Sequence, residues 1–142
     1  MDNIKKIRYF NRAFARSLHV FSPKALGMEY TLAEVRIIEE IALHENCTAN
    51  FLCQYLFIDK GYMSHILAKL ETIGLLKKEK ALADRRKWQL RLTSQGEALF
   101  AQIDALSNAQ VAGLIKDLSP TQLQLLQQAM STILKILPER PK

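Results

Sequence analysis

The stretch from Leu75 to Thr93 constrains the fold of this chain more than any other part. Two short segments of apolar and basic residues, LLKKEK and WQLRLT, flank the polar sequence ALADRRK. Short strand-like segments on either side of a polar tip are typical of a β-hairpin. The sequence therefore predicts strands at about 75–80 and 88–92, joined by a turn that carries Asp84, Arg85, Arg86 and Lys87.

The residues before this hairpin predict two short helices joined by a tight turn. The first runs from about Thr48 to Leu56, and Asp59 is a suitable N-cap for the second, because its carboxylate can accept from the free N–H groups of the next turn. Gly74 suits the left-handed position that ends this second helix. Two short helices and a turn indicate a helix-turn-helix, which the hairpin extends to a winged helix. The second helix is expected to bury Met63, Ile66, Leu67 and Leu70.

Helical spacing of apolar residues also predicts longer helices on both sides of this region. A first helix is expected over 3–21, ended by Ser22-Pro23. Thr31 and Glu34 form a capping-box pattern for a helix that reaches about Leu43. Thr93 can cap a long helix that is expected to use Ala98, Leu99, Ile103, Leu106, Val111 and Leu114. Ser119-Pro120-Thr121-Gln122 is a second capping box, with proline at the first helical position.

The last helix carries a heptad-like apolar seam, which Leu125, Ala129 and Ile136 widen beyond what one core contact needs. With the amphipathic first helix it predicts a homodimer, and an intramolecular bundle is the alternative. The predicted fold is mainly α with a small β-hairpin wing: a winged helix-turn-helix DNA-binding domain over 31–93, and dimerisation helices in 1–30 and 94–142. The predicted interface residues are Ile4, Ile7, Leu123, Leu126, Met130, Ile133 and Leu137.

Positive charge is concentrated in the predicted hairpin. Residues 77–91 contain seven basic and two acidic residues, whereas the whole chain has a net charge of +6. Residues 1–24 form a second basic segment, with six basic residues and one acidic residue. Such clustering favours a polyanionic partner. A basic hairpin beside a helix that fits a groove can hold duplex DNA at two points, so double-stranded DNA is the expected partner.

Two features argue against a membrane or secreted protein. No apolar stretch approaches the ~20 residues that a membrane span requires. The first residues are basic and amphipathic, without the apolar core and cleavage site of a signal peptide. We therefore expect a cytoplasmic protein without a membrane partner.

The segment IDKGYMSHILAKLETIGLLKKEKALADRRKWQLRLTSQG resembles the MarR family of transcriptional regulators. Its start, IDKGYMSHIL, also looks like the regulatory half of fused MarR–acetyltransferase proteins, but no acetyltransferase is expected in these 142 residues. The residues that carry the resemblance are Asp59, Leu70-Glu71, Gly74-Leu75, Asp84, Arg86, Leu92-Thr93 and Gly96.

The resemblance implies that Arg86 enters the minor groove and that Asp84 braces the wing by pairing with a neighbouring arginine. Arginine suits a narrow, negative groove because its guanidinium is flat, always charged and weakly hydrated. The role of Arg85 remains open: it could pair with Asp84 as the brace partner or contact a phosphate. Phosphates would be attracted by Lys77, Lys78 and Lys87. Gly61-Tyr62 replaces a Ser/Thr pair of the family, and His65 replaces an arginine. The major-groove contacts are expected from Lys60, Gly61, Tyr62, Ser64, His65 and Lys69.

The family function implied for this chain is that of a repressor. It would bind a pseudo-palindromic operator as a dimer, and a small aromatic or amphipathic effector would release it. The family pocket lies between the dimerisation helices and the winged domain. In this chain its expected residues are Phe14, Arg16, Leu18, His19, Tyr30 and Arg36.

Other functions receive less support. Neither a Gly-rich phosphate loop nor a recognisable catalytic spacing of His, Cys and acid occurs, so we predict no enzyme and no cofactor. His44, Glu45, Cys47 and Cys53 lie close in sequence but lack a C-x-x-C pair, so we predict no metal site. A redox- or metal-responsive regulator on the same scaffold remains an alternative. A winged helix used for protein–protein contact is another.

Overall fold

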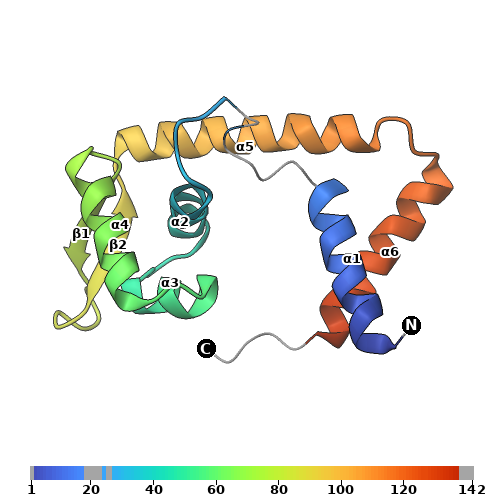
Figure 1. The fold of residues 1–142 in the computed structure, drawn as a ribbon. Coiled ribbons are helices and arrows are strands. Elements are labelled where there is room, and N and C mark those ends of the chain that lie inside the picture. Colours follow the sequence, from blue (N-terminus) through green and yellow to red (C-terminus); the bar gives the residue numbers. More distant parts are fainter. Residues whose placement is uncertain (1, 18–23, 25–26, 138–142) are drawn as a thin grey trace.

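The computed structural model describes residues 2–17, 24 and 27–137 and contains six helices and one hairpin in that part of the chain. Figure 1 shows a winged helix-turn-helix at one end, a long helix α5 along one edge, and two terminal helices at the other end. The predicted fold, mainly α with a β-hairpin wing, is confirmed. The elements are α1 (Asn3–Ser17), α2 (Leu32–Leu43), α3 (Ala49–Leu56), α4 (Lys60–Thr72), β1 (Leu76–Lys80), β2 (Trp88–Leu92), α5 (Ser94–Ile115) and α6 (Pro120–Ile136).

The predicted helix starts are confirmed by their hydrogen bonds. The Thr31 hydroxyl accepts from the Glu34 N–H at 3.1 Å, and the Glu34 carboxylate accepts from the Thr31 N–H at 3.0 Å, which is a complete capping box. Ser119 and Gln122 form the same arrangement at α6. Asp59 and Thr93 cap α4 and α5 through single side-chain acceptors.

The wing is an antiparallel pair in which Leu76 lies opposite Leu92 and Lys80 opposite Trp88. The wing is closed against α5 at its base. The Thr93 hydroxyl donates to the Gly74 carbonyl, and Gly74 has a positive φ of 85° that a side chain would strain. A Cβ at Gly96 would lie 2.0 Å from the Leu75 carbonyl oxygen, so only glycine lets α5 approach the wing this closely.

One continuous hydrophobic core lies under the winged region. It takes side chains from α2, α3, α4, the wing and the first half of α5, including Ile37, Leu52, Leu70, Leu76 and Ile103. All buried apolar residues of the described chain fall between Met28 and Ile103. The buried face of α4 is the predicted one, formed by Met63, Ile66, Leu67 and Leu70.

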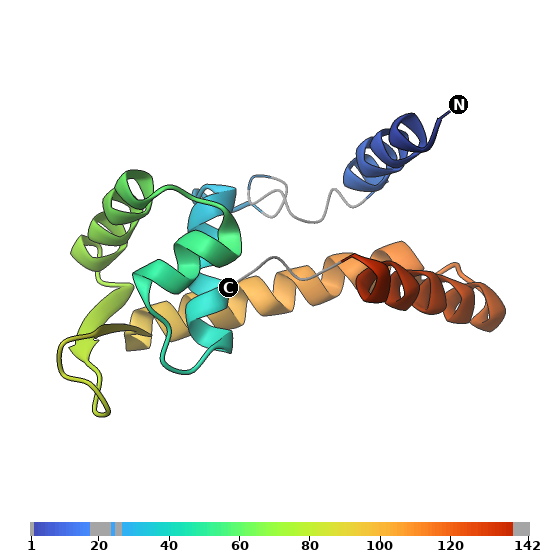
Figure 2. The ribbon, with the colours of Figure 1, turned by 90° about the horizontal axis from the view of Figure 1, so that it is seen from below.

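The terminal helices contrast with this core, because neither α1 nor α6 has a buried residue. They overlap in Figure 1, but Figure 2 shows them on separate paths on either side of a gap. The chain exposes 10725 Å², compared with about 7,500 Å² for a compact chain of its mass. This excess fits an extended molecule in which neither terminal helix buries a residue among the parts that the structure describes.

The structure corrects one expectation about the helices, the burial along α5, and leaves the end of the first helix untested. The first helix is described over Asn3–Ser17, whereas its expected continuation to Phe21 and the predicted Ser22-Pro23 stop lie outside the described residues. Of the six apolar residues expected to be used in α5, Leu99 and Ile103 are buried, Leu106 is half-buried, and Ala98, Val111 and Leu114 are exposed. The far half of the helix extends beyond the core. None of the described helices is long and apolar enough to cross a bilayer.

Candidate nucleic-acid interface

Helix α4 presents a polar face to solvent because its apolar residues are used in the core. The Asp59 carboxylate accepts from the Tyr62 N–H at 2.8 Å and fixes the start of the helix. A Cβ at Gly61 would lie 3.4 Å from the Asp59 carboxylate, so the fold itself does not require glycine there. The missing side chain leaves the backbone of the first turn open to a phosphate. The exposed positions include all the predicted groove contacts: Lys60, Gly61, Tyr62, Ser64, His65 and Lys69.

The wing tip has an ordered turn with Asp84 at its centre. The Asp84 carboxylate accepts from the backbone N–H of Arg86 at 3.1 Å and from its Nε at 3.2 Å. The expected brace therefore pairs Asp84 with Arg86, and Arg85 takes no part in the contact. The Arg86 side chain is still 92% exposed, and exposed ion pairs are weak, so its guanidinium can exchange this partner for a phosphate or a base.

The two faces of the wing differ in charge. Lys77 and Arg91 lie on one face, and both pair with Glu79, at 3.4 Å and 2.9 Å. Lys78, Lys80 and Trp88 lie on the other face of the hairpin. The buried Leu76 and Leu90 lie on this same face. The single carboxylate of Glu79 is therefore shared between two cations, and the expected role of Lys77 in attracting phosphates stays a prediction.

Three exposed residues of the wing were not predicted as site residues. The Lys80 ammonium lies 5.5 Å from the centre of the Trp88 ring, which places a cation and an aromatic ring together near the tip. Leu82 is 93% exposed, the largest exposed fraction of the large hydrophobic residues described. Strand alternation could have placed Lys80 and Trp88 on one face, but no sequence signal shows how exposed Leu82 is.

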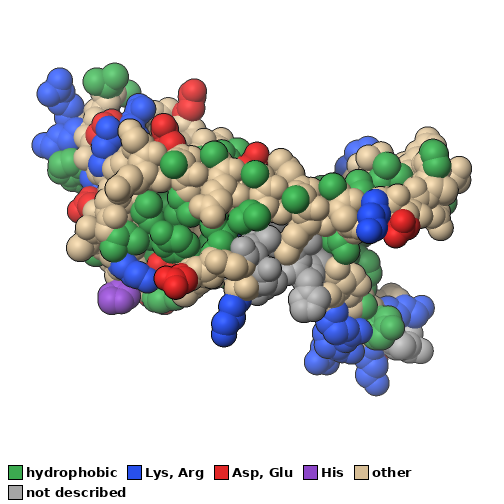
Figure 3. All heavy atoms as spheres, turned by 90° about the horizontal axis from the view of Figure 1, so that it is seen from above, with side chains coloured by type: hydrophobic (Ala, Val, Ile, Leu, Met, Phe, Trp, Pro, Cys, Tyr) green, Lys and Arg blue, Asp and Glu red, His purple; other side chains and the backbone are tan. Residues whose placement is uncertain are grey.

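Basic side chains gather at two ends of the molecule. Figure 3 shows Lys and Arg over the wing end and again over α1, with few between them. The second group is the basic face of α1, whose charged residues Lys5, Lys6, Arg8, Arg12 and Arg16 are all exposed. The positive wing therefore lies next to the exposed face of α4, while the basic face of α1 belongs to the opposite end.

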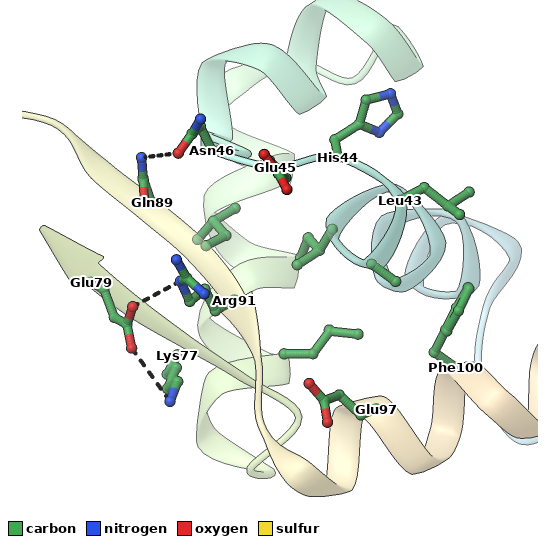
Figure 4. A pocket seen from close by; sticks show the side chains of 14 residues that line it. Leu43, His44, Glu45, Asn46, Lys77, Glu79, Gln89, Arg91, Glu97 and Phe100 are labelled. Atoms are coloured by element: carbon green, nitrogen blue, oxygen red, sulfur yellow. Dashed lines mark hydrogen bonds and ion pairs between the residues drawn. The ribbon is translucent and has the colours of Figure 1, made fainter. Parts of the chain in front are cut away.

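A polar pocket of about 860 Å³ lies behind the wing, between the end of α2, the hairpin and α5. Figure 4 shows Glu79 bridging Lys77 and Arg91 on one wall, and Glu97 and Phe100 on α5 opposite. A hydrogen bond of 2.8 Å from the Gln89 amide to the Asn46 carbonyl oxygen joins the wing to the α2–α3 connection. Sequence reasoning did not find this pocket, because its walls come from three distant segments.

The predicted effector residues are not brought together in the described part of the chain. Tyr30 lines a smaller pocket of about 310 Å³ with Met28, Lys69 and Gln102, but Phe14, Arg16 and Arg36 do not contribute to it. Arg16 and Arg36 are exposed. Leu18 and His19 lie outside the described residues. The effector site therefore stays a prediction.

Both cysteines are unsuited to thiolate chemistry. Cys47 is 2% exposed, and burial, together with the negative charge of Glu40, raises the pKa of its thiol to about 11. Burial also raises the pKa of Cys53. Sensor cysteines need the opposite shift. Among the described residues, no group of three or more His, Cys, Asp or Glu side chains could hold a metal ion.

Comparisons with known proteins agree with this architecture. The model of the MarR family matches residues 26–87, which contain α2, the helix-turn-helix and most of the wing. No curated protein sequence matches the chain. Three solved structures show how far the likeness extends.

The DNA complex of FabT from Streptococcus pneumoniae superposes with a TM-score of 0.76 at 19% identity, over 94% of this chain and 96% of that one. The reduced form of MarR from E. coli superposes with a TM-score of 0.71 at 20% identity, over 97% of this chain and 98% of that one. MepR from S. aureus bound to ethidium bromide superposes with a TM-score of 0.65 at 18% identity, over 92% of this chain and 96% of that one. The family model thus confirms the resemblance to the MarR family of transcriptional regulators for residues 26–87, and the solved structures share the fold over 92% or more of this chain.

Proposed function

We propose that this protein is a sequence-specific DNA-binding repressor that acts as a homodimer on a pseudo-palindromic operator. One observation carries the proposal: the exposed face of α4 and the cationic wing tip are fixed on one winged domain with a continuous core. A helix of this kind suits the major groove, and an exposed arginine suits the minor groove beside it. Residues 31–93 would be the DNA-binding domain, and the protein would work in the cytoplasm with its DNA.

The terminal helices support the dimer. Their apolar residues include Ile4, Ile7, Leu126 and Ile133, and none is buried in the single chain. Residues 1–30 and 94–142 would pair with the same segments of a second copy, although Leu99 and Ile103 also join the winged core. A dimer with its α4 helices about 34 Å apart would contact successive major grooves, which predicts a two-fold symmetric site.

Release by a small effector rests on the resemblance and on one relative. MepR is named as bound to ethidium bromide, an aromatic cation. A small aromatic or amphipathic effector would have to favour one dimer geometry over another to release the DNA. We propose no catalytic activity, because the proteins of similar fold are regulators.

Selection of bound sequences from a random DNA pool tests the proposal. The expected result is a two-fold symmetric site, bound with an affinity whose logarithm falls linearly with the logarithm of salt concentration. A protein–protein module would enrich no sequence.

Arg86→Ala should then weaken operator binding by about 1–3 kcal/mol and relax the sequence preference at one position of each half-site. Lys116→Ala, which removes an exposed positive charge at the end of α5, is the matched control and should leave affinity unchanged. Equal affinity of Arg86→Ala and the parent protein at fixed salt would remove Arg86 from the contact list.

A further inference from the structure

Glu34 is the one charged side chain that is buried among the residues the structure describes, with 3% exposed. Its two carboxylate oxygens have different partners. Oε1 accepts from the Thr31 N–H at 3.0 Å and completes the capping box of α2. Oε2 lies 2.9 Å from the Nζ of Lys69 on α4. The carboxylate therefore links the start of α2 to the helix expected to enter the DNA groove.

The surroundings of Glu34 keep it ionised. Burial alone would raise the pKa of this carboxyl, but the ion pair with Lys69 and the hydrogen bonding with Thr31 lower it below the ordinary value. A buried carboxylate without its counter-ion is costly, because the desolvated charge is left uncompensated. Separating the Lys69 ammonium from the Glu34 carboxylate is therefore energetically unfavourable.

The position of Lys69 on α4 suits this role better than a DNA contact. Lys69 adjoins the buried Leu70 and follows the buried Ile66 by three residues, so it lies at the edge of the buried face. Its side chain is 54% exposed, but its ammonium is committed to Glu34. Lys60, the other lysine of α4, forms no salt bridge with any described residue, so it is the appropriate comparison.

We propose that Glu34 and Lys69 form an ion pair that sets the orientation of α4 against α2, so that Lys69 is a positioning residue for DNA recognition rather than a phosphate contact. The inference rests on the proposed function. Glu34 is buried and negative and cannot itself bind DNA. Any loss of affinity on changing Glu34 must therefore act through the placement of α4.

The test uses Glu34→Gln, Lys69→Met and the double variant in the full chain. Glutamine can still accept from the Thr31 N–H, so the capping box is kept while the charge is removed. Operator affinity is measured over a series of salt concentrations. Each single variant should weaken binding by about tenfold with an unchanged salt slope. The double variant, which buries no unpaired charge, should bind at least as well as Lys69→Met and remains informative if that variant fails to fold.

Lys60→Met is the matched control. If Lys60 contacts a phosphate, this substitution should reduce the slope of log affinity against log salt concentration by about one. If Lys69→Met reduces the slope in the same way while Glu34→Gln has no effect, Lys69 is a phosphate contact and the proposal is wrong.

Hydrogen exchange in the free protein separates this proposal from the proposed function. Both single variants should speed amide exchange over 60–72 while leaving 94–103 unchanged. If the parent protein selects no DNA but exchange in α4 rises as expected, the ion pair holds α4 and only the DNA function fails. Unchanged exchange in both variants would overturn the positioning role whatever the protein binds.

Discussion

The winged region and the terminal helices use apolar residues in different ways. In the winged region, α2, α3, α4, the wing and the first half of α5 close a core in which Ile37 and Leu52 have no exposed surface. In α1 and α6 the apolar stripes are equally regular, but Ile7 and Leu125 remain more than half exposed. Regular helical patterning therefore shows that a face will be buried, but not whether the same chain supplies the partner.

The largest expected effect is loss of the dimer without unfolding of the winged region. Leu126→Glu with Ile133→Glu puts two charges on the apolar face of α6 and should give a monomer with a folded winged region. Operator affinity should fall on the order of 100-fold to 10,000-fold, because two linked half-sites become one. Sedimentation equilibrium and DNA binding measure both effects.

The control for that variant is Gln124→Glu with Gln128→Glu, which adds the same charge at exposed positions of α6. The control should remain dimeric. A dimer that survives in the apolar-face variant would show that α6 is not part of the interface.

A cavity in the winged core should destabilise the fold of each chain independently of dimerisation. Leu52→Ala removes a side chain that has no exposed surface and should lower the free energy of unfolding by about 2–5 kcal/mol. The loss should be the same at low and high protein concentration in denaturant titrations. Leu82→Ala, the same change at the exposed wing tip, should stay within about 0.5 kcal/mol of the parent. A Leu52→Ala effect that grows on dilution would mean that the winged region depends on the dimer.

The two capping boxes allow the same motif to be compared in both regions. Thr31→Ala and Ser119→Ala each remove one side-chain acceptor and should each cost about 1 kcal/mol. The effect of Thr31→Ala should not depend on protein concentration, whereas the cost of Ser119→Ala should appear as weaker dimerisation. Thermal unfolding at several concentrations measures both. Equal concentration dependence of the two variants would remove the distinction between the regions.

The smallest expected effect lies on α2, on the carboxyl group of Glu39. Burial, and then repulsion from Glu40 and from Asp104 of α5, raise the pKa of Glu39 against the opposing attraction of Arg36. A raised carboxyl pKa means that ionised Glu39 destabilises the fold at neutral pH, and this cost disappears as the pH falls below the ordinary value of 4.5.

Glu39→Gln should therefore raise the free energy of unfolding at pH 7 by less than about 0.5 kcal/mol. The difference from the parent should vanish near about pH 3, where the carboxyl is neutral in both states. Melting temperatures across this range provide the measurement. A constant difference at all pH values would point to a packing change instead of a charge effect.

Local features of the candidate site were predictable from sequence, but their partners often were not. Asp59 and Gly74 mark the ends of α4 through groups within a few residues, so pattern alone placed the helix. The brace of the wing tip was also local, yet two adjacent arginines offered equivalent partners for Asp84. Only the turn geometry selected Arg86.

Long-range features had no sequence signal. The Glu34–Lys69 pair joins residues in separate helices, and the Asn46–Gln89 bond joins a loop to a strand. The same limit explains the error in α5, where Val111 and Leu114 fit the helical pattern but extend beyond the core. Whether a residue on a regular stripe is buried depends on what lies opposite, which the stripe does not encode.

The sequence by itself determined the order of helices and strands, their caps, the apolar face of α4 and the cationic wing, because hydrogen bonds at helix ends and periodicity act over a few residues. The tertiary structure decided which charged side chains lie close enough to pair and how exposed each one is. Glu79 pairs with Lys77 and Arg91, Glu34 holds Lys69, and Arg86 stays exposed. Such pairings depend on distances between separate elements, and those distances are set only when the core closes.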